Sequence, residues 1–257
     1  MRGTKWRIYS RGRCSELSEK FAGKSRKEFT SSNIELDRRI GPIKIPSIVL
    51  IEGPNDSGKS VLSQQYVYGA LQSGLRVYYV TTESGYRQLI KNMEDVSFDV
   101  KYYFLNGDLK IAELHVKELE WKRDLAKKFL DLIINLIKNN PAFDVFVIDS
   151  LTYIATYASE EDILSFFTDL RNLVEEESKI LIITVHTHAF TQEMMLRIRS
   201  ICDVHFLLSI KEIGDRMVRI LQAPKIKGAI KSTSVILSFE VDTAFGIKVL
   251  PFSQARA

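Results

Sequence analysis

Residues 53–60 read Gly-Pro-Asn-Asp-Ser-Gly-Lys-Ser, and no other feature of the 257-residue chain constrains its fold as strongly. The octapeptide matches the phosphate-loop pattern, which places a lysine and a hydroxyl residue directly after the second of two glycines. An apolar run at residues 48–52 precedes it, and a segment of helical period at residues 59–72 follows. Strand, turn and helix in this order direct backbone N–H groups and the positive end of a helix dipole toward a phosphate. The pattern predicts an α/β domain that binds a nucleoside triphosphate.

All eight loop residues are candidate nucleotide-binding residues, and two of them have specific expected roles. Lys59 should bridge the β- and γ-phosphates, and the Ser60 hydroxyl should coordinate Mg²⁺. The expected cofactors are therefore ATP and Mg²⁺. A glycine-rich turn that binds nothing is disfavoured, because both the strand and the helix of the pattern flank the loop. The residues concerned are Gly53, Pro54, Asn55, Asp56, Ser57, Gly58, Lys59 and Ser60.

A second candidate ligand of the metal is Asp149, which ends the run Val-Phe-Val-Ile-Asp at residues 145–149. A continuous apolar run of this length is typical of a strand buried on both faces of a parallel sheet. Ligands of open α/β sheets bind at the carboxyl ends of the strands, where Asp149 would lie. We therefore expect Asp149 to hold Mg²⁺ together with Ser60.

Glu83 follows an apolar run at residues 77–82, the next expected strand after the phosphate-loop helix. From there its carboxylate can face the same crevice as Asp149 and orient or deprotonate an attacking water. The alternative is a structural carboxylate at a helix N-terminus, which the following Ser84 and Gly85 favour. The sequence leaves both roles open.

Polar residues also gather at the carboxyl end of the run at residues 180–185, namely Thr184, His186 and His188. A polar side chain at this end of a core strand could contact the γ-phosphate. Two histidines two residues apart also suggest a metal site. Zinc, however, needs three or four ligands, and no cluster of cysteines or carboxylates lies nearby in the sequence. We therefore favour the phosphate contact.

From residue 48 onward, short β-branched runs alternate with longer segments of helical period, the pattern of a parallel sheet flanked by helices. The expected strands are residues 48–52, 77–82, 100–105, 145–149 and 180–185. The expected helices are residues 59–72, 86–93, 119–138, 162–177 and 191–201. Strands with short connections then follow at residues 204–210, 217–222, 235–241 and 246–250. We predict a mainly parallel core with a C-terminal β-meander.

Two of these helices have a recognisable apolar face, which should pack on the sheet. In the helix at residues 119–138 the expected face consists of Leu125, Phe129, Leu132, Ile133, Leu136 and Ile137. In the helix at residues 162–177 it consists of Ile163, Phe166, Phe167, Leu170, Leu173 and Val174.

The basic charge of the chain is concentrated at its N-terminus. The first 30 residues contain nine basic and three acidic residues, a net charge of +6 within a total of +4, so the remainder carries −2. The pI near 8.9 therefore does not identify the globular part as a nucleic-acid-binding surface. We predict a basic, solvated tail at residues 1–30 and one ATP-binding domain at residues 31–257. A transit peptide, a misassigned start codon or a docking arm for phosphates or an acidic partner are alternatives for the tail.

Cysteine content and hydropathy indicate the compartment. The chain has two cysteines, Cys14 and Cys202, which argues against a disulfide framework and fits a reducing environment. No apolar run approaches the roughly 18 to 20 residues of a membrane helix. With 45% hydrophobic and 26% charged residues, the composition is that of a soluble globular protein. We predict a cytoplasmic location.

Taken together, the motifs resemble the RecA-like ATPases of the KaiC type, and within them the accessory ATP-binding proteins of the archaellum. Besides the phosphate loop, the glutamate strand and Asp149, similar segments lie at residues 34–46, 225–228 and 239–249. The resemblance covers residues 31–252, nearly the whole chain except the tail. The single-domain size and the amino-acid sequence of the phosphate loop at residues 53–60 favour the archaellum branch.

This resemblance implies a RecA-like fold and a nucleotide bound at a subunit boundary of a homo-oligomeric ring. Lys225 and Lys227 would then contact the γ-phosphate of the neighbouring subunit. The alternative is a solvated strand edge, where lysine discourages aggregation. The implied partners are the archaellum motor ATPase and ring scaffold proteins at the inner face of the membrane. The nucleotide state would control ring assembly and the interaction with the motor ATPase.

Two departures from the family pattern predict slow or absent hydrolysis. KaiC-like ATPases usually have two consecutive carboxylates where this chain has Glu83 and Ser84, and an arginine where it has Lys227. Ser84 provides no second carboxylate to position water, and lysine stabilises a spread phosphoryl charge less well than a planar guanidinium does. Nucleotide binding should persist because the phosphate loop and Asp149 are intact.

Two other functions fit parts of the sequence. A DNA-dependent RecA-type ATPase of recombination or repair would hold the DNA backbone with its basic tail or with a loop near residues 187–195. The slightly acidic globular part argues against it. A KaiC-like autokinase would need hydroxyl acceptors near the subunit boundary, for which Ser232, Thr233 and Ser234 are the candidates.

Overall fold

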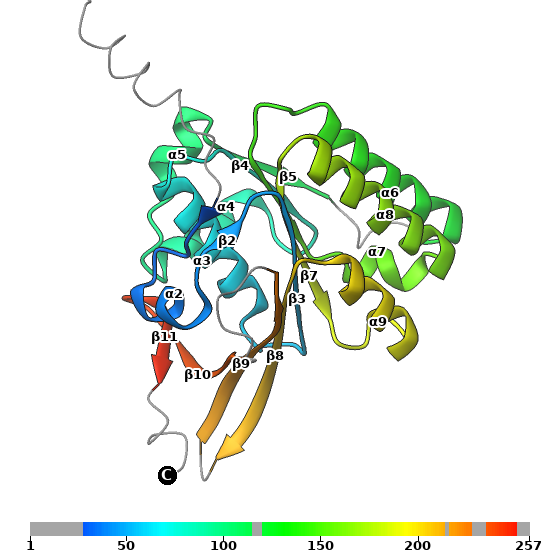
Figure 1. Cartoon of the computed structure of the whole chain (residues 1–257). Helices are drawn as coiled ribbons and strands as arrows, with labels where there is room; N and C mark the ends of the chain where they lie inside the picture. Colours follow the sequence, from blue (N-terminus) through cyan, green and yellow to red (C-terminus); the bar gives the residue numbers. More distant parts are fainter. Residues whose placement is uncertain (1–27, 115–119, 214–215, 228–234, 251–257) are drawn as a thin grey trace, which may run out of the picture.

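A sheet of nine strands forms the centre of the part of the chain that the computed structural model describes, residues 28–114, 120–213, 216–227 and 235–250 (Figure 1). Its strands are β3 (Ser47–Gly53), β4 (Val77–Thr81), β5 (Leu109–Glu113), β6 (Val145–Asp149), β7 (Ile180–His186), β8 (Val204–Ile213), β9 (Arg216–Ile226), β10 (Val235–Asp242) and β11 (Gly246–Leu250). They lie in the order β11-β10-β9-β8-β3-β7-β6-β4-β5. Pairing is parallel from β8 to β5 and antiparallel from β8 to β11. The prediction of a mainly parallel core with a C-terminal β-meander is confirmed.

Helices cover both faces of this sheet (Figure 1). They are α2 (Ile34–Ile40), α3 (Lys59–Gln72), α4 (Tyr86–Glu94), α5 (Lys101–Asn106), α6 (Arg123–Lys138), α7 (Thr152–Tyr157), α8 (Glu160–Glu176) and α9 (Gln192–Ile201). Helices α2 to α5 lie on one side and α6 to α9 on the other. A separate two-stranded sheet pairs β1 (Glu28–Phe29) with β2 (Ile43–Lys44).

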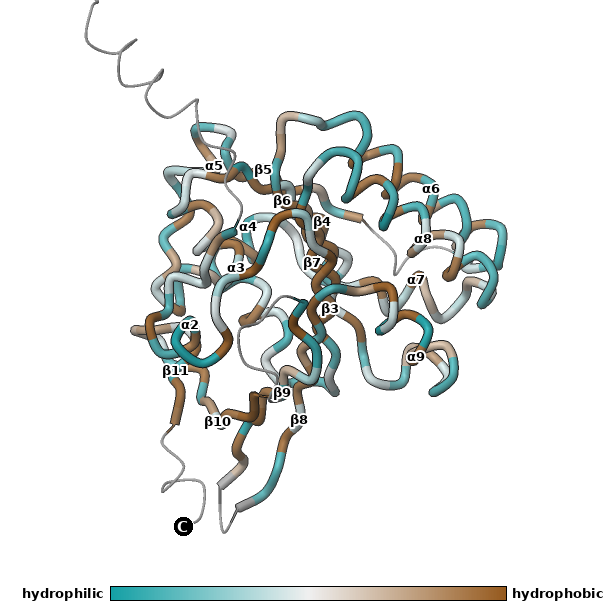
Figure 2. Tube along the Cα trace, in the orientation of Figure 1, coloured by the Kyte–Doolittle hydropathy of each residue, from teal (hydrophilic) through white to brown (hydrophobic). Residues whose placement is uncertain are grey.

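The central strands are apolar on both faces because each face packs against a layer of helices. Along β3, Val49 and Ile51 belong to the core on the α3 side, whereas Ile48 and Leu50 belong to the core on the α8 side. The same alternation holds in β4, β6 and β7. Figure 2 shows hydrophobic residues concentrated along the central strands and hydrophilic ones on the outer helices. This two-layer core fixes the strand ends on which a ligand site can be built.

One predicted strand is wrong. Residues 100–105 were expected to form a strand, but they lie in and beside helix α5, and the strand β5 follows it. The aromatic residues at 102–104 have high β-propensity, which tertiary context overrides. Gly107, in a left-handed conformation with φ of 79°, ends the helix and turns the chain into β5. Strand β5 lies at the edge of the sheet and is only partly buried, so its own pattern is weak.

The two predicted helix faces differ in outcome. The face of α8 is confirmed, since all six predicted residues are buried. The face of α6 is partly wrong, because its buried residues are Ala126, Leu130, Ile133 and Ile137, and Leu132 is 47% exposed. Partial burial of several flanking apolar residues on this helix explains why the pattern alone misjudged the direction of its face.

The N-terminal boundary of the fold lies earlier than expected. Glu28 and Phe29, which we assigned to the tail, form β1, and Phe29 is buried against Tyr66. Residues 1–27 of the predicted tail, and the Ser232, Thr233 and Ser234 cluster, lie outside the described residues. Within the described ranges, we find no helix with the length and apolarity needed to cross a membrane.

Candidate nucleotide site

A cavity of about 470 Å³ lies beside the phosphate loop, where the carboxyl ends of β3, β4, β6 and β7 come together. Crevices at this end of an open parallel sheet are where ligands bind. The β-meander closes one side of the cavity, because β9 and β10 each contribute a side chain. The lining residues are Asn55, Asp56, Gly58, Lys59, Ser60, Val61, Glu83, His186, Arg219 and Val241.

The phosphate loop is held in shape by its own contacts and by the β-meander. The Ser57 hydroxyl donates to the Pro54 carbonyl at 2.8 Å. Gly58 has a φ of 92°, which a residue with a side chain rarely adopts, and it is followed by α3. A Cβ at this position would lie 3.1 Å from the ring of Phe239 in β10. The loop therefore packs against the meander, and its second glycine is favoured by the backbone conformation and by the close approach of Phe239.

Lys59 is a nearly buried cation at the start of α3. Its side-chain ammonium donates to the Pro54 carbonyl at 2.7 Å. Burial lowers the pKa of Lys59, although the nearby Glu83 and Asp149 carboxylates partly oppose that effect. A neutral carbonyl is a weaker partner for an ammonium than a phosphate oxygen is. The side chain is therefore well placed to bind an anion in the cavity.

Asp149 accepts hydrogen bonds from three hydroxyl groups. Its Oδ1 atom accepts from Thr184 at 2.6 Å and from Ser60 at 3.3 Å, and its Oδ2 atom accepts from Tyr79 at 2.6 Å. Burial raises the pKa of Asp149, with the nearby Glu83 carboxylate adding to the effect and the hydroxyl donors opposing it. Burial and the Asp149 carboxylate together raise the pKa of Tyr79 well above its usual value.

These atoms form a donor set that fits Mg²⁺, a cation that prefers oxygen ligands from carboxylates, hydroxyls and phosphates. The structure brings the Ser60 hydroxyl and the Asp149 carboxylate into contact across 89 residues of sequence. Both lie at the same strand ends as the loop, as the sequence pattern predicted. The arrangement can hold a divalent cation between the protein and the phosphates of a nucleotide.

Glu83 lies at the cavity wall, where its Oε1 atom accepts a hydrogen bond from the Ser150 hydroxyl at 3.0 Å. The alternative role as the carboxylate of the α4 N-terminus is taken by Glu113 at the end of β5, which accepts from the Tyr86 N–H at 2.5 Å. Glu83 therefore faces the cavity rather than the helix end. This position is compatible with orienting a water molecule beside a bound nucleotide.

The three polar residues near the end of β7 have separate surroundings. Thr184 is buried against Asp149, His186 lines the cavity, and His188 is exposed. Burial lowers the pKa of His186, and the positive charge of Lys59 adds to the effect. Within the described ranges, no three His, Cys, Asp or Glu side chains are arranged to hold a metal ion.

Sequence reasoning missed Arg219, the cavity residue contributed by β9. Its Nε atom donates to the Asp56 carbonyl of the phosphate loop at 2.9 Å, so it ties the loop to the β-meander. Tyr79 was missed as well, although its hydroxyl contacts Asp149. Neither residue belongs to a local motif, and the topology alone brings them to the site.

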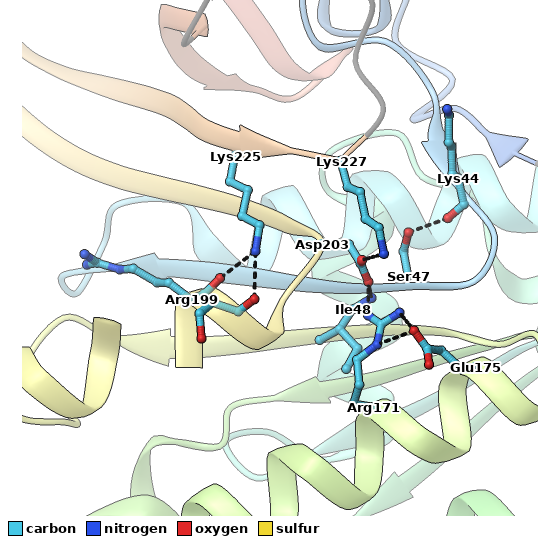
Figure 3. Close-up of polar contacts among 10 residues, drawn as sticks. Lys44, Ser47, Ile48, Arg171, Glu175, Arg199, Asp203, Lys225 and Lys227 are labelled. Carbon is cyan, nitrogen blue, oxygen red and sulfur yellow. Dashed lines mark hydrogen bonds and ion pairs between the residues drawn. The ribbon is translucent and has the colours of Figure 1, made fainter. Parts of the chain in front are cut away.

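Lys225 and Lys227 lie outside the cavity lining and already have partners in their own chain (Figure 3). The Lys225 ammonium donates to the carbonyls of Arg199 at 3.0 Å and Ser200 at 2.9 Å, at the C-terminus of α9. The Lys227 ammonium pairs with Asp203 Oδ1 at 3.0 Å, with 67% of its side chain exposed. A contact with the phosphate of a neighbouring subunit stays a prediction.

Asp203 is the centre of a cluster of charged side chains shown in Figure 3. Its carboxylate pairs with Arg171 and Lys227, and it accepts a hydrogen bond from the Ile48 N–H at 2.9 Å. Burial alone would raise the pKa of Asp203, but the N–H donor and the two cations outweigh it, so the pKa is lowered. This cluster ties α8 and β9 to the start of β3.

Glu52 forms a similar cluster one residue before the phosphate loop. The Arg199 guanidinium donates to both of its carboxylate oxygens, at 2.9 and 2.7 Å, and His205 Nε2 lies 2.9 Å from Oε2. Burial would raise the pKa of Glu52, but the hydrogen bonds from His205 and Arg199 outweigh it and lower the pKa. The base of the loop is thereby joined to α9 and β8.

The comparisons with known proteins agree with this geometry. A family model described as "ATPase: KaiC" matches residues 30–254. The archaeal flagellar ATP-binding protein FlaH of Sulfolobus acidocaldarius is 42% identical over 228 residues, which are 89% of this chain and 99% of that protein. FlaH of Methanocaldococcus jannaschii is 30% identical over 226 residues, 85% of this chain and 93% of that protein. The crystal structure of flagellar accessory protein FlaH from Methanocaldococcus jannaschii has a TM-score of 0.74 at 26% identity, covering 88% of this chain and 99% of its own.

Proposed function

The chain belongs to the KaiC family of ATPases and to its archaeal flagellar branch, as its motifs predicted, and we propose that it binds ATP with Mg²⁺ beside the phosphate loop. The observation that carries this proposal is the convergence of Lys59 and Ser60 on one cavity, with the Asp149 carboxylate in contact with Ser60. Backbone N–H groups of the loop and the Lys59 ammonium would bind the phosphates. Ser60 and Asp149 would hold Mg²⁺, which neutralises phosphate charge when bound.

We propose that hydrolysis is slow or absent. Glu83 lines the cavity and can orient a water molecule, but Ser84 follows it where related ATPases have a second carboxylate. The Glu83 carboxylate is also engaged by the Ser150 hydroxyl. One partly engaged carboxylate gives less support to an attacking water than two do. The nucleotide would then act by being bound, favouring one state of the protein, more than by supplying energy through hydrolysis.

The similar proteins are named archaeal flagellar ATP-binding proteins, and the proposed role follows from that similarity. The chain would be a regulatory component of the archaellum motor complex, positioned at the inner face of the membrane by that complex. ATP would favour one assembly state of a homo-oligomeric ring and one mode of interaction with the motor ATPase and scaffold proteins. Such control requires that the partner has different affinities for the loaded and empty forms.

For the contact between neighbouring subunits, Lys227 is a better candidate than Lys225. Among the described residues Lys227 makes one ion pair, with the buried Asp203, and its own side chain is mostly exposed, so solvent screening keeps the contribution of the pair to roughly 1 kcal/mol or less. The ammonium of Lys225 makes two hydrogen bonds at the end of α9. Lys227 can therefore leave its partner at lower cost to reach a phosphate on another subunit.

The experiment measures ATP affinity and turnover on one sample of the full chain. Lys59→Ala should weaken ATP binding about 100-fold, since a hydrogen bond to a charged group contributes roughly 1.5–3 kcal/mol and Lys59 would contact two phosphates. Lys101→Ala, an exposed lysine on α5, is the matched control and should have no effect. Turnover should be negligible and unchanged by single-stranded DNA.

The same sample tests the regulatory role. A purified archaellum motor ATPase should be retained by the ATP-loaded chain more strongly than by the nucleotide-free chain. Equal retention in both states would contradict nucleotide control. Rapid hydrolysis that single-stranded DNA stimulates would contradict the regulatory function and would support the recombinase-type alternative.

A further inference from the structure

Tyr79 is a fully buried tyrosine whose hydroxyl lies beside the Asp149 carboxylate. It sits in the middle of β4, with its ring in the core between the sheet and α3. The hydroxyl donates to Asp149 Oδ2 at 2.6 Å and lies 3.4 Å from the Ser63 hydroxyl of α3. A buried tyrosine hydroxyl usually has a polar partner, and here the partner is a residue of the candidate nucleotide site.

The donors to Asp149 divide between its two oxygen atoms. Oδ2 accepts from Tyr79 alone among the described residues, whereas Oδ1 accepts from Thr184 and, at the longer distance of 3.3 Å, from Ser60. The rotation of a carboxylate about its last side-chain bond is soft, so hydrogen bonds at both oxygens are needed to fix its plane. Tyr79 fixes the oxygen that points away from Ser60.

The ring of Tyr79 is itself rigidly held, which makes it a suitable anchor. Tyr79 is in register with Ile111 of β5 on one side and with Val147 of β6, the strand of Asp149, on the other. Side chains packed in such a core occupy single conformations. The position of the carboxylate is therefore determined by the sheet as well as by its contact with Ser60 of the phosphate loop.

We propose that Tyr79 is a positioning residue of the Mg²⁺–nucleotide site, which holds Asp149 Oδ2 so that Oδ1 is presented beside the Ser60 hydroxyl. The inference rests on the proposed function, the binding of ATP with Mg²⁺. Residues that orient a metal-binding carboxylate typically change metal affinity about 10- to 100-fold when they are removed. The effect should appear in the Mg²⁺ requirement and not in the binding of phosphates by the loop.

Tyr79→Phe removes the hydroxyl and keeps the ring, and the chain offers a matched control in Tyr66→Phe. Tyr66 lies on α3, is also fully buried, and belongs to the same core. Among the described residues, its hydroxyl has no hydrogen-bond partner. The two variants therefore remove the same atom from the same layer, but only one of them releases Asp149.

The experiment titrates Mg²⁺ into each full-length variant with a fluorescent ATP analogue, and it repeats the binding measurement in EDTA. Tyr79→Phe should raise the half-saturating Mg²⁺ concentration about 10- to 100-fold and leave the affinity in EDTA unchanged. Tyr66→Phe should change neither value. Thermal unfolding of each variant shows that it is folded, and in an Asp149→Asn background the Tyr79→Phe change should have no further effect on the Mg²⁺ requirement.

Two outcomes would overturn the inference alone. One is a Mg²⁺ requirement of Tyr79→Phe equal to that of Tyr66→Phe. The other is an equal loss of affinity with Mg²⁺ and in EDTA, which a merely structural role would produce. Failure of the wild-type chain to bind the analogue under any condition would overturn the proposed function and the inference with it.

Discussion

The molecule contains two sets of buried carboxylates, and they have opposite kinds of partners. Asp149, at the nucleotide site, accepts from neutral hydroxyl groups, and its pKa is raised by burial. Asp203 and Glu52, at the junction of α8, α9, β8 and β9, are paired with arginine, lysine or histidine side chains. Hydrogen bonds and charge pairing lower the pKa of both against the effect of burial.

This difference separates a site that can accept a cation from a cluster that already contains its cations. A carboxylate that only neutral donors satisfy keeps its full negative charge for an added ion, and burial makes that ion bind more strongly. A carboxylate paired with a guanidinium contributes to joining the elements of the fold instead. The predictions that follow test this contrast from the largest expected effect to the smallest.

Asp203→Asn should lower the free energy of unfolding by roughly 3 kcal/mol, because it leaves the Arg171 guanidinium without its buried partner. ATP affinity should stay unchanged, since the partners of the Asp203 carboxylate among the described residues, Ile48, Arg171 and Lys227, lie outside the cavity lining. Urea unfolding and ATP titration of the same preparation measure both quantities. The control is Asp169→Asn, at an exposed position on α8, the helix that carries Arg171. It should change neither the stability nor the ATP affinity. A stable variant with weakened ATP binding would reverse the assignment of the two regions.

Asp149→Asn should have the opposite profile. ATP affinity in the presence of Mg²⁺ should fall on the order of 100-fold, because the amide cannot offer the cation a full charge. The free energy of unfolding should be unchanged or slightly higher, since the variant removes a buried charge that only neutral groups satisfy. A loss of stability as large as that of Asp203→Asn would show that the two carboxylates do not differ in the proposed way.

Acid should weaken the fold through the paired carboxylates. The pKa values of Glu52 and Asp203 in the folded state lie below their ordinary values of 4.5 and 3.8. Their contribution to stability is therefore fully present above the unfolded pKa values and is lost as the pH falls through the lower, folded ones. Unfolding measured from pH 6 downward should show the loss beginning below about pH 4.5. The free energy of unfolding should depend less steeply on pH in Asp203→Asn than in the wild-type chain. An equal dependence would contradict the assignment.

Lys227→Ala should have the smallest effect on the isolated chain. Its side chain is mostly exposed although its partner Asp203 is buried, and Asp203 keeps its pair with Arg171, so the free energy of unfolding should fall by about 1 kcal/mol or less. ATP affinity should be unchanged in dilute solution and should weaken only at concentrations where the chain self-associates. Light scattering alongside ATP titration separates the two regimes. Unchanged affinity in the assembled state would remove Lys227 from the proposed contact between subunits.

Where local motifs define them, the residues of the candidate nucleotide site could be placed in the fold from the sequence. The phosphate loop, Asp149 and Glu83 each follow a recognisable apolar run, and parallel strands bring their carboxyl ends to one edge. Arg219 and Tyr79 could not be predicted in this way. Arg219 lies on a meander strand 163 residues from the carbonyl it contacts, and Tyr79 lies in the middle of a strand that reads as core.

The fold was predictable to a similar degree and failed for physical reasons of the same kind. The central strands are apolar on both faces and could be placed from their composition. Strand β5 and helix α5 were misassigned because an edge strand needs fewer apolar residues, and because three aromatic residues with high β-propensity lie in a short surface helix. Partners brought together only by topology, such as Asp203 and Arg171, leave no local signal in the sequence.

Hydrogen exchange with and without ATP and Mg²⁺ would test the central claim most directly, with the chain dilute enough to remain monomeric. We predict slower exchange at residues 53–62 and at the strand end that includes Asp149, and no change at residues 199–205 or 225–227. The backbone at residues 53–62 and at the Asp149 strand end would contact or support the ligand. The backbone at residues 199–205 and 225–227 is already fixed by its own ion pairs. Protection confined to residues 199–205, or an unchanged phosphate loop at saturating ATP, would contradict the account.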